Sequence, residues 1–593
     1  MSKPAIPWLK RFCALYARHD RSIYQWAVDP HPSGILITLT LDRGKVHLLV
    51  HARNESASYA TTTSLALSIH QPEGSDRMPG NGELVVRQFI NVMNRADKGD
   101  IQLPTGRGTA FKAEPVDTKA IEAAHEALAD ELHWGSFLAY RSVITEDLYP
   151  HVQPLGKTVS HEAILSGWKE TVRRIGDGTA PPLLGLYLHI PFCTVACSFC
   201  YCAKTDKFNR GNLDTYIENL QAEIRSFGDI FDESTFTSVY FGGGTPSLLS
   251  PPALRALFST LYDAFHVPDG TQVIFEGNPD SLNSQKVEIL AKHGKVTRLT
   301  IGVQTLDDRV QALVQRFNKP DHVREAVESG RAHGIKHVNC DLMAGMPLQT
   351  MESFQKDLLF LLELNPDSIH LNGYRPLPRT QLATSNGEMP EEQIRLRDEM
   401  IAWATETLKD AGHTTDAGQA PRRTRNAANI QEYDLRRQNS SLLGLGFPAR
   451  SHSFSGHYYS PDASDGLDPA LQRDLQGERR WHAIEVDDEE ERHKYLVSNL
   501  RTGFTRSEFE GLFGMDPIEA APEAFKKLGM LGVVHVTDDE VHSHSETSKD
   551  IYVYRTLFYS ESQHARAREI WGHEYDRNED YQSKLVELIE NSG

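Results

Sequence analysis

The chain has 593 residues, of which 39% are hydrophobic and 24% charged, and its formal net charge at pH 7 is −19. This composition supports roughly two to four folded domains, excludes a mainly disordered chain, and argues against a protein that coats nucleic acid. We find no run of about 18 apolar residues and no apolar signal-peptide core, so we expect a cytoplasmic location and no membrane partner.

Residues 1–180 are predicted to form an α+β extension. Residues 34–54 alternate polar and apolar side chains around an Asp-Arg-Gly turn, which predicts a hairpin. Residues 64–74 and 82–95 contain further strand or strand-to-helix patterns, and residues 118–134 have the composition and spacing of a helix. No catalytic combination of residues occurs here, so the role of the extension stays open. The Gly- and Pro-rich segment Gly176–Pro182 is the expected boundary.

Residues 181–390 alternate short apolar runs with longer amphipathic segments. This order predicts parallel βαβ units. Because six strands are expected rather than eight, an open barrel is favoured over a closed one. The expected strands cover 183–191, 237–244, 271–279, 297–304, 336–345 and 367–374, and helices are expected at 213–228, 251–265, 321–334 and 351–364.

The remainder divides into two regions. Residues 391–485 are predicted to flank the barrel with helices and loops, and the glycines of 444–461 suggest either tight turns near a ligand or core, or ordinary loops. Residues 486–593 contain three helical stretches, then a hairpin pattern, then a charged helical tail. That order is typical of a winged-helix module.

Four of the six cysteines lie close together. Cys193, Cys197 and Cys200 form a C-x3-C-x2-C pattern, and Cys202 follows. Three thiolates on one short loop can bind three irons of a [4Fe–4S] cluster and leave the fourth iron for another molecule. A structural zinc site normally has four closed ligands, so zinc held by these cysteines and Cys202, or by a nearby histidine, is the alternative.

This cysteine pattern after a strand resembles the radical S-adenosylmethionine (SAM) superfamily. The stretch 187–202 with the FGGGTPS segment 241–247 is similar to the HemN-like branch, which includes oxygen-independent coproporphyrinogen III oxidases, heme chaperones, heme-ring-opening enzymes and class C methyltransferases. The resemblance covers roughly 183–560. It implies a [4Fe–4S] cluster on the three cysteines and one or two SAM molecules. The reduced cluster would cleave SAM to a 5′-deoxyadenosyl radical that abstracts a hydrogen from the substrate.

Polar residues at the carboxyl ends of the predicted strands support a ligand site there, because ligands of parallel sheets bind at that edge. By resemblance, Arg316 pairs with the SAM carboxylate, the glycines contact its amino group, and Phe199 shields cluster or adenine. Tyr187 and Cys202 are the candidate catalytic residues, with Cys202 a hydrogen donor, an accessory group or a free thiol. The expected SAM pocket contains Tyr187, Phe199, Gly242, Gly243, Gly244, Thr245, Glu276, Gln304, Arg316, Asp341 and Arg375.

The expected substrate is a small molecule, either a tetrapyrrole or a specialised metabolite, and the expected reductant is a flavodoxin or ferredoxin. A class C methyltransferase or cyclopropane-forming enzyme and a heme-binding chaperone remain alternatives; Cys202 argues weakly against the chaperone. The winged-helix pattern also suggests DNA binding as a hypothesis. The acidic run 486–492 and the negative net charge argue against a nucleic-acid partner.

Overall fold

The computed structural model describes part of the chain in detail. The chain divides into two compact units. The predictions for residues 82–95 and 118–134 and for most of the C-terminal tail lie outside the described residues. The described residues are the backbone of four N-terminal strands and residues 157–200, 202–205, 209–376, 380–386, 389–413, 441–500, 503–530, 534–543 and 555–561, with 564, 565 and 568.

The first unit contains an antiparallel meander in the order β1-β2-β3-β4. The hairpin predicted over residues 34–54 is confirmed, since β2 and β3 pair from Leu41↔Gly44 to Ile35↔Val50. The strand predicted in 64–74 is also present. The four strands are β1 Ile23–His31, β2 Gly34–Leu41, β3 Gly44–Ala52 and β4 Leu65–His70.

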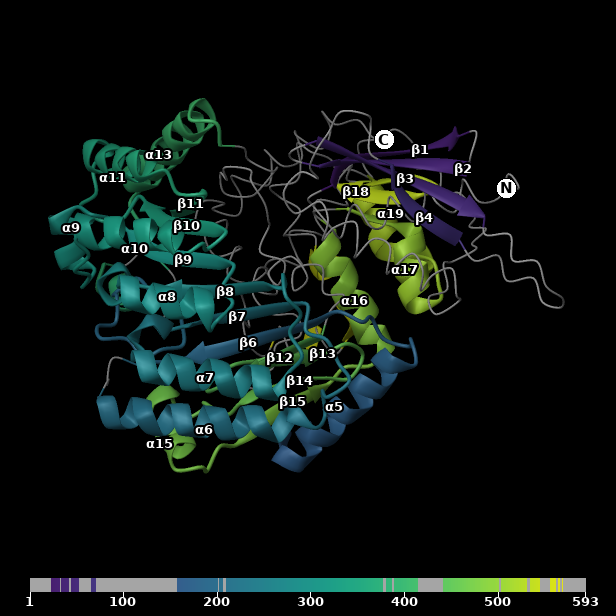
Figure 1. Ribbon diagram of the computed structural model, residues 1–593, viewed down its shortest axis with the longest axis horizontal. Helices are drawn as coiled ribbons and strands as arrows, with labels where there is room; N and C mark the ends of the chain where they lie inside the picture. Colours follow the sequence, from purple (N-terminus) through teal and green to yellow (C-terminus); the bar gives the residue numbers. More distant parts are fainter. Residues whose placement is uncertain are drawn as a thin grey trace. The chain divides into compact units, whose positions relative to one another are not determined.

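The second unit is built on a parallel sheet in which all six predicted strands appear in chain order (Figure 1). Neighbouring strands pair in parallel from β6 to β11. The strand β11 ends the sheet and does not pair with β6, so the barrel is open, as expected. The strands are β6 Leu184–Ile190, β7 Ser238–Gly243, β8 Gln272–Gly277, β9 Arg298–Gln304, β10 His337–Ala344 and β11 Ser368–Gly373.

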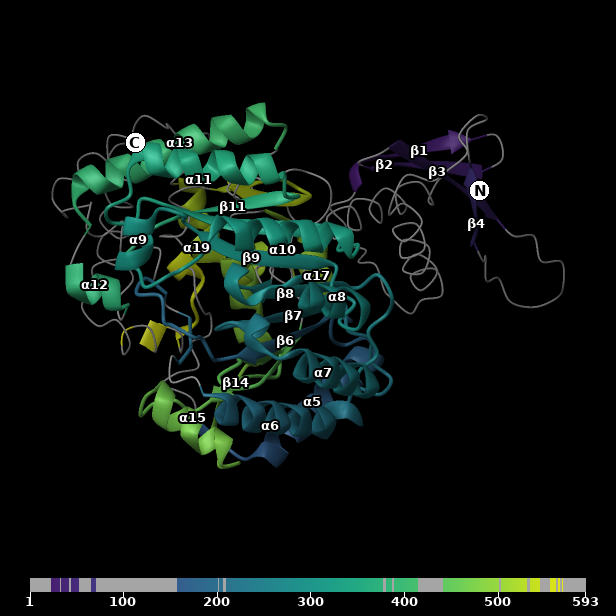
Figure 2. The same cartoon turned by 60° about the vertical axis from the view of Figure 1, so that its left-hand side comes forward.

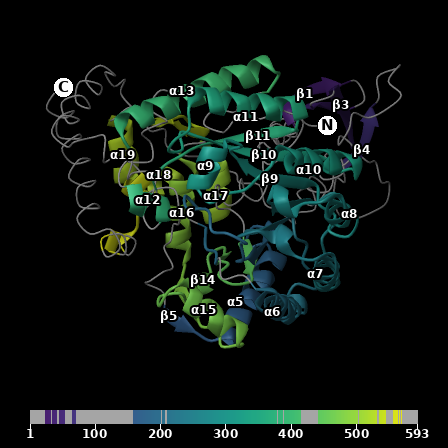
Figure 3. The ribbon, with the colours of Figure 1, turned by 90° about the vertical axis from the view of Figure 1, so that its left-hand side faces the viewer.

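Helices connect successive strands and form a curved outer layer, visible as an arc from α6 to α11 in Figure 3. Each buries an apolar stripe against the sheet; α6, for example, buries Leu213, Ile217 and Leu220. In Figure 2 the helix α13 runs along α11. The helices are α6 Arg210–Gly228, α7 Pro251–Ala264, α8 Ser284–Lys292, α9 Asp308–Leu313, α10 Pro320–Ala332, α11 Met351–Leu364, α12 Gln381–Asn386 and α13 Glu391–Asp410, with 3-10 turns at Pro246–Leu248 and Pro279–Ser281.

The sheet continues past β6, where the sequence predicted only flanking loops and helices. A further strand, β12, pairs in parallel with β6, and antiparallel strands follow it. Ten of the eighteen residues 444–461 lie in these strands. Gly446, with a φ of +81°, forms a tight turn after β12 and packs against the Tyr216 hydroxyl and the His189 carbonyl in the core. These strands have three to five residues, too short to show alternation. They are β12 Ser441–Leu445, β13 Ser451–Ser453, β14 His457–Pro461, β15 Trp481–Glu485 and β5 Lys157–Val159, with helix α15 at Leu467–Leu475.

The boundary expected near residue 180 differs from the structure. The strand β5 and the helix α5, His161–Gly176, belong to the second unit. Trp168 of α5 is fully buried, and its indole Nε1 donates to the Tyr459 hydroxyl at 2.6 Å. Residues 157–176 are thus part of the barrel unit.

The described C-terminal region contains four helices and three short strands. The strands form a small sheet in the order β16-β18-β17. None of the helices in the described part of the chain is long and apolar enough to cross a membrane. The elements are α16 Asp488–Asn499, β16 Phe504–Thr505, α17 Arg506–Phe513, α18 Pro517–Ala520, α19 Pro522–Met530, β17 Val534–Val536 and β18 Glu540–Ser543, with a 3-10 turn at Arg555–Phe558.

Candidate active site

The three motif cysteines lie on the loop that follows β6. The ends of this loop are tied together, because Cys193 N donates to Thr205 O at 3.0 Å and Thr205 N donates to Pro191 O at 2.7 Å. Within it, Cys200 N donates to Cys197 O at 3.0 Å. All three are free thiols. The loop therefore holds three sulfur donors on a closed backbone.

A histidine that the sequence did not single out anchors this loop to β6. His189 Nε2 donates to Ala203 O at 2.7 Å, and its Nδ1 accepts from the Tyr187 hydroxyl at 3.0 Å. Burial lowers the pKa of His189 to about 4, so the imidazole is neutral at pH 7, with its proton on Nε2. The only sequence signal for His189 is its place in the strand that leads into the cysteines.

The fourth cysteine of the motif lies beside the third. The Cys202 thiol donates to the Cys200 sulfur, and this bond, opposed by burial and aided by the Lys204 charge, lowers the pKa of Cys200 to about 5. Lys204 Nζ also donates to Cys200 O at 2.9 Å. Cys202 is an exposed residue. The arrangement favours a thiolate at Cys200 and a protonated thiol at Cys202.

The glycine segment after β7 packs directly on the cysteine loop. Gly244 N donates to Ile190 O at 2.7 Å, and Thr245 Oγ1 donates to Cys193 Sγ at 3.3 Å. A Cβ on Gly244 would lie 2.6 Å from Phe192 O, and Gly243 has a φ of +111°. Glycine is therefore required here by close backbone approach and by conformation.

A partly buried carboxylate, that of Glu276, lies next to this segment. Glu276 accepts from the Tyr240 hydroxyl at 2.5 Å. Its Oε2 is 3.0 Å from where a Cβ on Gly242 would lie. Burial raises the pKa of Glu276 to about 7, because the bonds from Tyr240 and from the Gly243 N–H only partly offset the loss of hydration. Asp341, two strands away, accepts from Asn339 Nδ2 at 2.8 Å.

Arg316 joins the cysteine loop to β8 and β9. Its Nη1 donates to Cys197 Sγ at 3.3 Å, and its Nη2 donates to Asn278 Oδ1 at 2.9 Å and to Gly302 O. Arg316 Nε and Gln304 Oε1 are buried and have no hydrogen-bond partner among the described residues. Asn278 is a further residue that the sequence reasoning missed.

Two other residues of the predicted SAM pocket, Phe199 and Arg375, lie in different surroundings. Phe199 packs against an apolar cluster that includes Val314 and Met346, whereas Arg375 is exposed in the segment after β11. The contacts thus link Tyr187, Gly242, Gly243, Gly244, Thr245, Glu276 and Arg316 to one another or to the cysteine loop.

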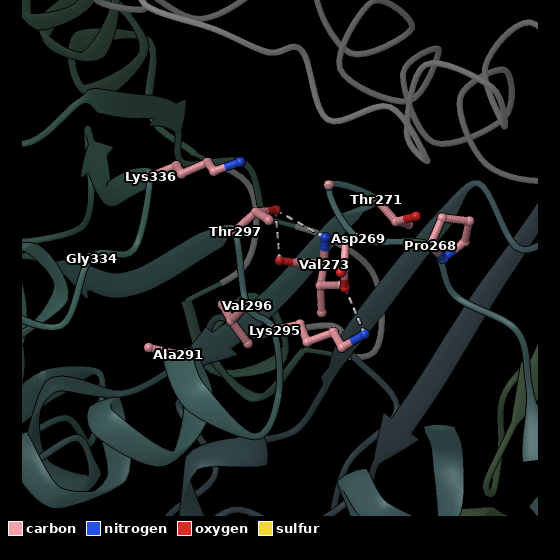
Figure 4. Close-up of a pocket in the computed structure, with 11 residues that line it drawn as sticks. Pro268, Asp269, Thr271, Val273, Ala291, Lys295, Val296, Thr297, Gly334 and Lys336 are labelled. Atoms are coloured by element: carbon pink, nitrogen blue, oxygen red, sulfur yellow. Dashed lines mark hydrogen bonds and ion pairs between the residues drawn. The ribbon is translucent and has the colours of Figure 1, made fainter. Parts of the chain in front are cut away.

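A separate hollow of about 230 Å³ lies elsewhere in the barrel (Figure 4). Its lining includes Thr271 and Thr297, which lie just before β8 and β9, and Lys295, which bridges to Asp269 at 2.9 Å. These residues are at the amino ends of the strands, opposite the cysteine loop. The hollow is therefore not part of the candidate site.

The residues around the cysteine loop fit a cluster and a polar ligand. Three thiols lie on one loop, and the Phe192 backbone leaves no room for a Cβ at Gly244. Two buried polar atoms, Gln304 Oε1 and Arg316 Nε, have no hydrogen-bond partner among the described residues. Among the described residues, no three His, Cys, Asp or Glu side chains are grouped so that they could hold a single metal ion.

Comparison with known proteins agrees with this geometry. The model of the radical SAM superfamily matches residues 187–361. Oxygen-independent coproporphyrinogen III oxidase of Pseudomonas aeruginosa is 30% identical over 354 residues, which cover 56% of this chain and 75% of the relative. The heme chaperone HemW of Haemophilus influenzae is 29% identical over 216 residues, covering 36% of this chain and 56% of that protein.

The solved structure of coproporphyrinogen III oxidase (HemN) from Escherichia coli has the same fold, with a TM-score of 0.58 at 23% identity, and the match covers 71% of this chain and 98% of that one. The fold and the cysteine loop thus define a radical SAM protein. Within that class, the chain belongs to the HemN-like family. Membership implies a [4Fe–4S] cluster and SAM.

Proposed function

We propose that Cys193, Cys197 and Cys200 bind a [4Fe–4S] cluster and that the protein uses SAM to abstract hydrogen from a tetrapyrrole-related substrate. The observation that carries the proposal is the braced cysteine loop, which has three free thiols and contacts from Thr245 and Arg316 on two of them. When bound, the reduced cluster supplies the electron that cleaves the C5′–S bond of SAM and yields methionine and a 5′-deoxyadenosyl radical.

The surrounding side chains then bind and orient SAM. Glu276, when ionised, attracts the SAM ammonium group, and the close-packed glycines expose backbone groups to it. Gln304 Oε1 and Arg316 Nε, which have no hydrogen-bond partner among the described residues, can accept one hydrogen bond from SAM and donate one to it, respectively. Asp341 offers a further carboxylate. Tyr187 fixes His189, and His189 fixes the end of the cysteine loop.

Cys202 is proposed as a hydrogen donor or accessory group in turnover. Its thiol is protonated beside the Cys200 sulfur, and the residue is exposed. A protonated, accessible thiol near the radical source can return a hydrogen atom. Phe199, one residue before a proposed ligand, packs over the apolar cluster and limits access of water and oxygen.

The substrate class rests on the relatives. Several relatives named as coproporphyrinogen III oxidases align with more than half of this chain, which favours oxidative tetrapyrrole chemistry. A heme-binding role is the second candidate, because the HemW match is of similar identity over a shorter segment. Methyl transfer remains the third. Free thiols and a reducible cluster favour a reducing compartment, the cytoplasm, and a flavodoxin or ferredoxin as reductant.

The first experiment measures metal and SAM cleavage under anaerobic conditions. Reconstituted protein should contain about four irons per chain and, with dithionite, release 5′-deoxyadenosine. The Cys197→Ala variant should lose both, while Cys340→Ala, a change at a buried strand position away from the loop, should keep both. Zinc in place of iron, or iron retained in Cys197→Ala, would contradict the proposal.

The second experiment separates the substrate classes. Reduced protein with SAM is incubated with coproporphyrinogen III or with heme. Release of CO2 supports the oxidase, formation of S-adenosylhomocysteine supports methyl transfer, and stable heme binding without SAM cleavage supports the chaperone.

A further inference from the structure

A buried carboxylate on the outer helix layer holds the backbone that follows Gln304. Asp357 of α11 is 3% exposed. Its Oδ2 accepts from Thr305 Oγ1 at 2.8 Å and from Leu306 N at 2.9 Å. A carboxylate is costly to bury without such partners, and burial raises its pKa to about 6 against the effect of these two bonds.

The backbone next to these bonds is in an uncommon conformation. Gln304 has a φ of +66°, and Thr305 N donates to Val303 O at 2.8 Å, which closes a tight turn around Gln304. A non-glycine residue in this region needs support from its surroundings. The two bonds to Asp357 supply that support at the residues directly after the turn.

The same segment continues to the cysteine loop. Asp307 caps α9 by accepting from Arg309 N at 2.9 Å. At the other end of α9, Ser198 N of the cysteine loop donates to Val314 O at 3.1 Å. Two residues later, Arg316 contacts Cys197. A displacement at Asp357 would therefore be transmitted to both Gln304 and the loop.

We propose that Asp357 is a positioning residue that sets the side chain of Gln304, and through α9 the Arg316–Cys197 contact, for SAM binding. Asp357 itself is too deep in the helix layer to be a ligand. This inference rests on the proposed function, because it assumes that Gln304 faces SAM.

The test uses four variants of the full chain with reconstituted cluster. Asp357→Ala removes both bonds, Thr305→Val removes one, and Asp357→Asn keeps an oxygen that accepts both. The matched control is Asp367→Ala, because Asp367 Oδ2 accepts Val338 N at 2.9 Å at the amino ends of the strands. Each variant is measured for iron content, thermal unfolding, SAM affinity by titration, and the change in the EPR spectrum of the reduced cluster when SAM is added.

Asp357→Ala should keep its iron and weaken SAM binding about tenfold or more, with a smaller EPR response. Thr305→Val should fall between Asp357→Ala and wild type, and Asp357→Asn should resemble wild type. Asp367→Ala should unfold at lower temperature with unchanged SAM affinity. If Asp357→Ala does not fold, Thr305→Val decides the question.

Two results would overturn this inference and leave the proposed function standing. The first is an unchanged SAM affinity in Asp357→Ala, or in Thr305→Val where Asp357→Ala does not fold. The second is a loss of SAM affinity in Asp367→Ala equal to that in Asp357→Ala. If the iron-loaded wild-type protein binds no SAM, the proposed function fails and the inference fails with it.

Discussion

Arg316 donates from Nη1 to Cys197 Sγ across 3.3 Å, and Asn278 fixes the same guanidinium through Nη2 at 2.9 Å. The sequence led us to expect Arg316 on the SAM carboxylate. That pairing stays a prediction, and the structure adds a contact between the guanidinium and a proposed cluster ligand. A charged donor on a ligand sulfur stabilises the reduced, more negative state of a cluster.

Replacing Arg316 should therefore lower the reduction potential of the reconstituted cluster. We expect Arg316→Met to shift it on the order of 50–100 mV more negative, and Asn278→Ala to shift it less, because the guanidinium stays but loses a support. Potentiometric titration followed by EPR measures this shift. An unchanged potential in Arg316→Met would show that the contact has no electronic effect.

Gly244→Ala should prevent cluster assembly. The added Cβ would lie 2.6 Å from Phe192 O, which is backbone next to Cys193 and cannot rotate away. Gly176→Ala is the control, because nothing lies within 4 Å of its Cβ position. Iron per chain after reconstitution should fall severalfold in Gly244→Ala and stay at the wild-type level in Gly176→Ala.

SAM affinity should rise with pH through about 7. The ionised form of Glu276 binds a cation, and its pKa is raised to about 7. Since the pKa is higher in the folded than in the unfolded state, ionising Glu276 costs folding stability, so its contribution falls as pH rises from about 4.5 to 7. Glu276→Gln should remove the pH dependence of SAM affinity near pH 7 and reduce the loss of folding stability between about pH 4.5 and 7. A wild-type SAM affinity that is flat between pH 6 and 8 would contradict the assignment.

Cys202→Ser should retain the cluster and SAM cleavage but lose product formation. Serine keeps a hydroxyl near Cys200 but cannot donate a hydrogen atom readily. Comparing 5′-deoxyadenosine with product per turnover measures the uncoupling. Loss of iron in this variant would instead make Cys202 a ligand.

The contact of α16 with β13 predicts that the free energy of unfolding falls at acidic pH. Glu491, Lys494 and His452 are fully or almost fully buried, and Glu491 bonds to both partners. Burial alone would raise the pKa of Glu491, but Lys494 and His452 lower it to about 2. The stability it contributes is present above about pH 4.5 and is lost as pH falls towards 2.

Glu491→Gln should therefore destabilise the protein by roughly 3–5 kcal/mol at pH 7, because it leaves a buried lysine without its counter-charge. The difference from wild type should shrink as the pH falls below about 4. Chemical unfolding at several pH values measures it. Equal stability of the two proteins at pH 7 would contradict this account.

The parallel strands and the cysteine loop could be predicted from the sequence because their signals are local. Apolar runs such as 297–304 are bounded by turn residues, and three cysteines at fixed spacing require no knowledge of the fold. The glycine segment was predicted through its resemblance to the family motif, and the structure supplies the physical reason, because a Cβ on Gly244 would meet the Phe192 backbone.

Other parts of the site depend on contacts between distant residues. His189, Asn278 and Asp357 belong to no motif, and each acts through one or two hydrogen bonds to a segment far away in sequence. The strand β12 joins β6 although more than one hundred residues of barrel lie between them in the chain, and its five residues carry no periodic pattern. Such pairings are set by the assembled sheet.

The pairing of β15 with β5 makes the barrel depend on residues 157–176, which precede the barrel strands in the sequence. Trp481 pairs with Val159, and Trp168 donates to Tyr459. A shortened protein that begins at residue 181 would leave one side of β15 with bare backbone donors and acceptors, a template for a second molecule to pair with. Such a fragment would fail by self-association while every residue of its cysteine motif was still present.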